Sequence, residues 1–366
     1  MKPAALLTLL ALAAAGSGPS FARALDGSLE SVPTLVAALS APAAESRKRA
    51  LDALGRKGPA AREAARLIVR ALKDPDPAVR SAAAGALGRL GPHAGAAAGA
   101  LAELISDPVQ GVRVHAVWAL GNLGPRAVVA LAGLERSLED KDPFVRENAA
   151  WSLGMIGPAA EPAAAGLIRA LKDEASHVRE RAAGAIGAVG LKTEAALGAL
   201  ISGLGDKNPD VRMSAATALG SLGREAAPAV PALVSRLRDP DAYVRMSSAL
   251  ALERMGPEAA GPAVPAIAEA LGDGDPFVRM SAADALGDMG QAGHPAASAL
   301  RRALSDVEPE VRRHAAMSLG MIGKAEESFL LPLLADADPR VRMSAAMALQ
   351  MSPSEAGARR AAPSVP

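Results

Sequence analysis

The feature that most constrains this chain is a phrase of about 33 residues that returns along most of its length. It reads DPDPAVRSAAAGALGRLGP at residues 74–92 and DKDPFVRENAAWSLGMIGP at residues 140–158. Nine Val-Arg pairs mark the phrase, and successive arginines are 33 residues apart except for one interval of 34 and one of 30. Arg47 lies 33 residues before Arg80 and opens the series without the valine. Self-similarity at a fixed period of this length indicates a solenoid, here of ten units from about residue 26 to residue 352.

Each unit contains two stretches with helical periodicity. In the unit 92–124, Pro92 suits the first turn of a helix, and Asp107-Pro108 ends that helix because a residue before proline disfavours the α region. The second helix follows and ends at Gly124, where a left-handed residue is favoured. Gly-Pro junctions recur at 58–59, 91–92, 124–125, 157–158 and 256–257. The pattern predicts an all-α fold, a right-handed, armadillo-like α-solenoid of about ten helix pairs over residues 23–352, without internal linkers.

The apolar residues of the second helix share one face. With the arginine of the Val-Arg pair as position 0, that face holds positions −1, +3, +6, +7 and +10, which are Val, Ala, Ala or Ser, Leu or Ile, and a large aliphatic residue. We expect this stripe to pack on the first helix of the unit. Position +4 is usually Ala and position +8 usually Gly, so we expect neighbouring units to approach closely. Close approach also explains a chain that is 50% hydrophobic but only 2% aromatic.

The charged residues follow the same period. In nine units an aspartate precedes the arginine by six residues. Because an arginine can take a carboxylate bidentately, we expect a ladder in which each arginine is shared between the aspartate of its own unit and that of the next. Nine equal copies favour a structural role over catalysis. The predicted ladder consists of Asp74, Arg80, Asp107, Arg113, Asp140, Arg146, Asp173, Arg179, Asp206, Arg212, Asp239, Arg245, Asp273, Arg279, Asp306, Arg312, Asp336 and Arg342.

This order of residues resembles HEAT repeats, and more narrowly the HEAT-like repeats of the phycobiliprotein (PBS) lyase type. The resemblance covers about residues 26–352. It implies that the second helices line a concave face and that the protein is a scaffold, although a few such proteins are bilin lyases and distant relatives are DNA-repair glycosylases. The first unit departs from the pattern at Ala41, Ser46 and Lys57, which suits a solvated cap.

The two ends differ from the repeats. Residues 1–22 have a positive start, an apolar run at 3–15 and small residues at candidate cleavage sites, which together predict a bacterial-type signal peptide. We expect an exported protein, periplasmic or secreted, that begins near Gly16 or Arg23 and has no stable membrane insertion after cleavage. A non-cleaved helix that caps the array is the alternative. Residues 353–366 read as a disordered tail.

A partner is expected on the concave face, at positions +1 and +5 of the second helix. Both tryptophans of the chain stand at +5 in adjacent units, and methionines are frequent in later units. Trp is a common interface anchor, and Met surfaces adapt to irregular apolar partners. The alternative is that these residues only fill consensus positions between helices. The predicted partner-binding residues are Trp118, Trp151, Val114, Met213, Met246, Leu250, Met280, Met317, Met343 and Met347.

The remaining composition excludes several functions. The chain has no cysteine, and its five histidines are scattered over different units without metal-ligand spacing. We therefore expect no catalysis, no metal and no cofactor. A net charge of +1 disfavours nucleic-acid binding. The sequence predicts an exported, monomeric scaffold for a protein or peptide partner, with a bilin-lyase-like chromophore handler and then a nucleic-acid-binding protein as alternatives.

Overall fold

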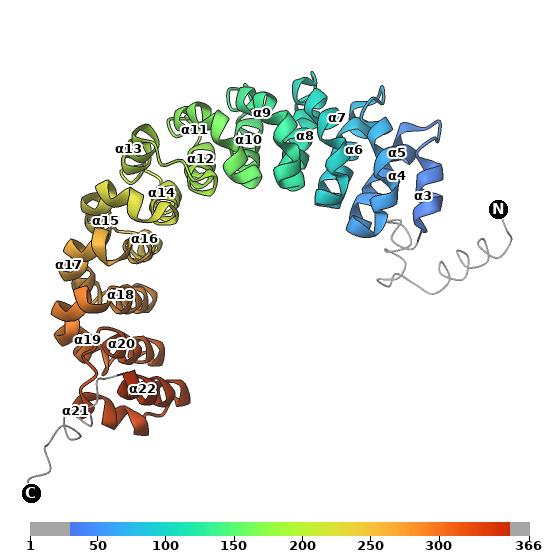
Figure 1. Cartoon of the computed structure of the whole chain (residues 1–366). Coiled ribbons are helices and arrows are strands. Elements are labelled where there is room, and N and C mark those ends of the chain that lie inside the picture. The colour runs from blue at the N-terminus through green and yellow to red at the C-terminus, as the bar shows by residue number, and fades with distance from the viewer. Residues whose placement is uncertain (1–29, 352–366) are drawn as a thin grey trace, which may run out of the picture. The chain divides into compact units, whose positions relative to one another are not determined.

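The computed structural model describes residues 30–351, so the predicted signal peptide (1–22) and tail (353–366) lie outside the described residues. The described chain forms two compact units, residues 30–170 and 171–351. Helices and turns make up both units, and no strand occurs between residues 30 and 351. Each unit is a stack of helix pairs, which confirms the predicted all-α solenoid (Figure 1).

The second helices of the repeats are regular α-helices of 13 or 14 residues, apart from one of 19 that continues through a kink at Gly256. Those of unit 1 are α4 (Ala44–Lys57), α6 (Pro77–Leu90), α8 (Gln110–Leu123) and α10 (Pro143–Ile156). Those of unit 2 are α12 (Ser176–Val189), α14 (Pro209–Leu222), α16 (Ala242–Ala260), α18 (Pro276–Asp288), α20 (Pro309–Met321) and α22 (Pro339–Met351).

The first helices are shorter, and most begin as 3-10 segments rather than as the predicted α-helix. Prolines inside several of these segments, such as Pro162 and Pro228, lack the N–H that an α-helix would need there. Unit 1 holds α3 (Val32–Ala38), η1 (Gly58–Ala64), α5 (Ala65–Ala71), η2 (Gly91–Ala97), α7 (Ala98–Glu103), η3 (Leu104–Ser106), η4 (Gly124–Ala130), α9 (Leu131–Ser137), η5 (Gly157–Ala163) and α11 (Ala164–Ala170). Unit 2 holds α13 (Glu194–Gly203), η6 (Gly223–Ala229), α15 (Val230–Arg236), η7 (Gly261–Ala263), α17 (Val264–Ala270), η8 (Gly290–Ala296), α19 (Ala297–Ala303), α21 (Glu327–Leu330) and η9 (Leu331–Ala335).

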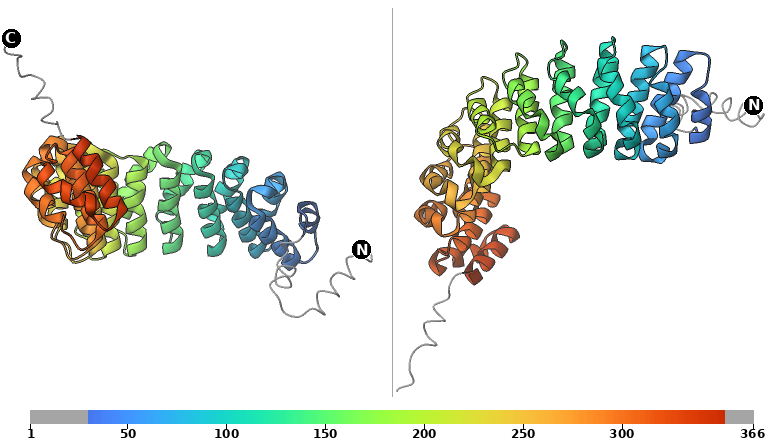
Figure 2. Two further views of the ribbon diagram at one scale, coloured as in Figure 1. Left: turned by 90° about the horizontal axis from the view of Figure 1, so that it is seen from below. Right: turned by 45° about the horizontal axis from the view of Figure 1, so that its top comes forward.

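Within each unit the helices form two layers, one of first helices and one of second helices, which Figure 2 shows from two further directions. The core lies between the layers. In α8 the predicted stripe is fully buried, namely Val112, Ala116, Ala119, Leu120 and Leu123. The reversal after α8 needs a positive φ of 60° at Gly124, as expected for a glycine that ends a helix.

One segment is apolar enough by length and composition to cross a membrane, Gln110–Ser137, and 56% of its most apolar window is buried. It is folded as α8, η4 and α9, and the chain reverses at Gly124. Its apolar residues therefore belong to the core between the layers.

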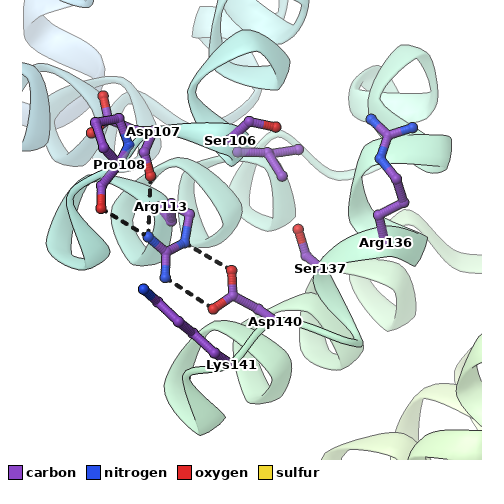
Figure 3. Close-up of a pocket in the computed structure, with 9 residues that line it drawn as sticks. Ser106, Asp107, Pro108, Arg113, Arg136, Ser137, Asp140 and Lys141 are labelled. Atoms are coloured by element: carbon purple, nitrogen blue, oxygen red, sulfur yellow. Dashed lines mark hydrogen bonds and ion pairs between the residues drawn. The ribbon is translucent and has the colours of Figure 1, made fainter.

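The arginine–aspartate ladder is present, and its arginines are shared between two aspartates as predicted, although the two aspartates take part through different groups. The Nε and Nη2 atoms of Arg113 donate to the carboxylate of Asp140 in the next repeat, at 2.8 and 3.0 Å (Figure 3). Its own Asp107 offers only the main-chain carbonyl, which accepts from Nη1 at 3.1 Å. The carboxylate of Asp107 belongs to Arg80 of the preceding repeat. Each arginine is thus shared as expected, but its own aspartate contributes a carbonyl oxygen instead of a carboxylate.

We call each such bidentate pair a rung. Eight rungs lie within the two units as described, and in all of them both side chains are largely buried. They are Arg47–Asp74, Arg80–Asp107, Arg113–Asp140, Arg179–Asp206, Arg212–Asp239, Arg245–Asp273, Arg279–Asp306 and Arg312–Asp336. Arg47 was not included in the predicted ladder because its own 33-residue repeat lacks both the valine and the aspartate.

Three further predicted ladder residues make hydrogen bonds to main-chain groups of their own unit. Arg146 donates through Nη1 to the carbonyl of Asp140, and Asp173 accepts from the N–H of Ala175. Arg342, in the last described repeat, donates through Nη1 to the carbonyl of Asp336.

Candidate functional site

The candidate site is the solvent-facing side of the second helices, which we call the second-helix face. Positions −2, +5 and +9 lie within about 40° of each other on a helical wheel. They point away from the core stripe, and residues at −2 and +9 are exposed in most repeats. Whether this face is concave stays a prediction.

The two tryptophans lie at the contact between consecutive second helices. A Cβ built on Gly88 would meet Cζ3 of Trp118 at 2.4 Å, and one built on Gly121 would meet Cζ3 of Trp151 at 2.4 Å. Each indole therefore covers the +8 glycine of the preceding repeat and is half-buried. The glycines allow this contact, as predicted, and the edges of the indoles remain part of the second-helix face.

The other predicted residues also line this face, with graded exposure. Six of them are half-buried: Val114, Met213, Met246, Leu250, Met280 and Met317. Met343 and Met347 in α22 are 60% and 45% exposed. The structure thus brings Met213, Met246 and Met280 to the same register of successive helices in unit 2, and we call these three half-buried side chains the apolar strip.

Sequence reasoning missed the most exposed aromatic rings, which stand at position −2. Phe144 is 56% exposed, Tyr243 66% and Phe277 62%. The sequence could have predicted them, because position −2 lies between positions +5 and +9 on the helical wheel and so shares their solvent-facing side.

Helix capping positions these rings. The N-cap aspartate just before each helix accepts from the backbone N–H of the aromatic residue, as Asp241 does from Tyr243 at 2.9 Å and Asp275 from Phe277 at 2.8 Å. Such caps contribute roughly 0.5–2 kcal/mol each and hold the first helical turn in place. The ring of each residue therefore projects from a well-ordered backbone.

Unit 2 also carries three carboxylates on two neighbouring second helices. Glu253 stands at +8 of α16 in place of glycine, and Asp284 and Asp288 stand at +5 and +9 of α18. Burial, followed by the negative charges of Asp288 and Asp284, raises the pKa of Glu253 to about 7. Glu253 is therefore protonated in slightly acidic solution, and the charge of this part of the face depends on pH.

The histidines at position +2 contact neighbouring repeats. Nδ1 of His115 lies 2.9 Å from Oγ of Ser81 in the preceding repeat, and Nδ1 of His314 contacts the carboxylate of Asp284. Both histidines thus contact a side chain of the preceding repeat. In the part of the chain that the structure describes, no group of three His, Asp or Glu side chains is arranged to hold a metal ion. The arrangement of apolar strip and paired charges suits binding.

A family model described as HEAT repeats matches residues 32–108, 97–187, 164–253, 230–306 and 297–364. No curated protein matches the chain. The narrower likeness to the phycobiliprotein-lyase type stays a prediction.

The solved structures that share the fold include three with TM-scores of 0.58 to 0.61 against this chain. An engineered protein is 24% identical with a TM-score of 0.58, covering 87% of this chain and 98% of its own. A chain from a structure in which Kap95p binding changes the switch loops of RanGDP is 15% identical, with a TM-score of 0.60 and coverage of 87% and 49%. Importin beta is 16% identical, with a TM-score of 0.61 and coverage of 89% and 52%. The present chain spans about half the length of the latter two.

Proposed function

Because the chain belongs to the HEAT-repeat family, we propose that it is an exported scaffold that binds a protein or peptide on its second-helix face and performs no catalysis of its own. Kap95p, whose binding acts on RanGDP, supports the idea that a stack of this fold can present a protein-binding surface. The export part of the proposal depends on the signal-like residues 1–22.

The observation that carries the proposal is the pair of exposed rings Tyr243 and Phe277 in consecutive repeats of unit 2. Aromatic side chains supply large contact area and dominate interface energetics. The half-buried Met246 and Met280 stand next to them in the same two helices, at +1. An apolar strip of this kind is uncommon on a surface without a partner.

The mechanism is the addition of small contacts along a preformed surface. The rungs and the close glycine contacts already order the helices. Binding of a partner therefore costs little conformational entropy on this side of the interface. Flexible methionines between the aromatic rings can then adjust to the shape of the partner.

The test replaces both rings in the full chain, Tyr243→Ser with Phe277→Ser, and measures capture of envelope proteins from the source cells by quantitative mass spectrometry. We expect the protein captured by the parent chain to be recovered about tenfold less. Helicity should not change, because exposed substitutions usually alter stability by less than about 0.5 kcal/mol.

The matched control is Val307→Ser, which removes another exposed apolar side chain (83% exposed) from the turn between α19 and α20. Equal capture by the double variant and the control would contradict the proposal. The N-terminal residue of the chain recovered from the envelope checks export separately, with a start near Gly16 or Arg23 expected.

A further inference from the structure

We propose that unit 1 carries a pocket for one aromatic side chain that bears, or lies beside, a carboxylate. The pocket lies on the second-helix face between α4, α6 and α8, around Gly85. This inference rests on the proposed function, since it states what a partner presents to one part of that face.

Two later repeats of the chain hold an aromatic ring at the position that corresponds to Gly85. In α8 and α10 the +5 side chain is an indole that covers the +8 glycine of the preceding repeat. In α6 the +5 residue is Gly85, so no indole covers Gly55, the +8 glycine of α4. The Arg89 side chain covers that glycine instead: Nη1 lies 3.0 Å and Cδ 3.4 Å from a Cβ built on Gly55, and Cα of Ala86 lies 3.2 Å from it. A flexible arginine side chain therefore lies where the next two repeats hold an aromatic ring.

A surface pocket of about 270 Å³ lies beside this arginine, with Gly85 and Arg89 in its lining. It is smaller than the roughly 300–1,000 Å³ of sites for whole small molecules and suits a single side chain. Gly85, Ala78 and Ala82 in its lining are small, so the face of a ring can approach the helix there. Its lining consists of Lys48, Asp52, Ala78, Ser81, Ala82, Gly85, Arg89 and His115.

The charges around the pocket favour an anionic group next to the ring. Lys48 is paired with Asp52 at 2.9 Å, whereas the exposed Arg89 forms no ion pair with any described residue. Nδ1 of His115 is engaged by Ser81 and by the carbonyl of Gly111 at 2.8 Å. Arg89 is therefore available both to stack on an aromatic ring and to bind a carboxylate through a charge-assisted hydrogen bond.

N-acetyltryptophan is the probe, because it carries an indole and a carboxylate. Titrated into the full chain and followed by NMR, it should bind saturably with a Kd of about 1 mM and shift the signals of Gly85 and His115. N-acetyltryptophanamide, which lacks the carboxylate, should bind about threefold or more weakly. N-acetylalanine should not bind.

Gly85→Trp recreates the arrangement of α8 and α10 and fills the pocket, so it should weaken binding of the probe at least about tenfold. Gly85→Ala is the matched control. Its Cβ would lie at ordinary contact distance from Cδ2 of His115 (3.5 Å) and Nη1 of Arg89 (3.8 Å), and binding should be retained. If the tryptophan variant does not fold, Arg89→Gln is the second test. This variant should bind N-acetyltryptophan and N-acetyltryptophanamide equally well, because it lacks the guanidinium that recognises the carboxylate.

Absence of binding to the parent chain, shifts confined to other residues, or unchanged binding by a folded Gly85→Trp variant would each overturn the pocket. None of these outcomes touches the scaffold proposal, whose test lies in unit 2. Conversely, if the Tyr243/Phe277 variant captures its partner as well as the parent chain does, the scaffold proposal fails, but probe binding at Gly85 is unaffected.

Discussion

At the scale of single residues, glycine at position +8 decides how closely two repeats can stack. In α8 a Cβ on Gly121 would lie 2.4 Å from Cζ3 of Trp151 and 2.5 Å from Oγ of Ser152. The hydroxyl of Ser152 is itself buried and donates to the carbonyl of Val117 at 2.8 Å. Neither neighbour can move without disturbing the contact between α8 and α10.

Gly121→Ala is therefore expected to destabilise the protein by about 1–3 kcal/mol through overpacking, despite the better helix propensity of alanine. Urea unfolding followed by circular dichroism measures the change. Gly99→Ala on α7 is the control, because its added Cβ meets nothing within 4 Å. The control should be neutral or stabilising by about 0.5–1 kcal/mol. Equal shifts of both variants would argue against close stacking at Gly121.

At the scale of elements, each second helix is held at its first turn by a cap and a rung. The Asp239 side chain is fully buried and accepts from Arg212 at 2.7 Å and from Arg236 at 3.2 Å. Burial alone raises the pKa of Asp239, but the hydrogen bonds from Arg212 and from the N–H of Asp241, with the charges of both arginines, outweigh burial and lower it.

We expect Asp239→Asn to reduce the free energy of unfolding at neutral pH by about 3 kcal/mol, because a buried arginine loses its counter-charge. The lowered pKa means that this rung stabilises the fold above the ordinary pKa of an aspartate, about 3.9, and that the contribution disappears as the pH falls through the folded-state pKa. The variant should therefore show a smaller loss of stability below pH 4 than the parent chain.

Glu269→Gln serves as the control for this rung. It breaks the Arg238–Glu269 pair, whose side chains are 79% and 64% exposed, and such a surface pair contributes less than about 1 kcal/mol. A similar loss of stability in both variants would show that the rungs act as ordinary surface ion pairs.

At the scale of the whole molecule, stability is built from contacts between neighbouring repeats. Deleting residues 212–244 removes one complete period and joins Val211 to Arg245. The rungs Arg179–Asp206 and Arg245–Asp273 keep both partners. We expect this variant to fold, with helicity per residue and cooperative unfolding close to those of the parent chain.

Deleting residues 212–227, about half a period, is the matched control. It joins two helices out of register, so the core stripe and the rungs no longer coincide, and helicity should fall. Equal folding of the two deletions would mean that the register between repeats is unimportant, contrary to the ladder and to the glycine contacts.

Much of the fold could be read from the sequence because it repeats. The period, the two helices of each unit, the buried stripe of α8 and the glycine turns depend on residues close to one another in the chain. The members of the ladder were identified for the same reason, since a fixed spacing of six residues places aspartate and arginine on either side of one turn.

Tertiary structure alone decided how the repeats meet. The 33-residue period does not fix the offset between neighbouring helices, and that offset gives Arg113 the carboxylate of Asp140 but only the main-chain carbonyl of Asp107. The same offset lays Trp118 over Gly88, leaves the Arg89 side chain over Gly55, and leaves Tyr243 and Phe277 exposed. The sequence by itself determined which residues recur, because recurrence is local; the stacking of one helix on the next decided which of them pair, which are covered and which remain for a partner.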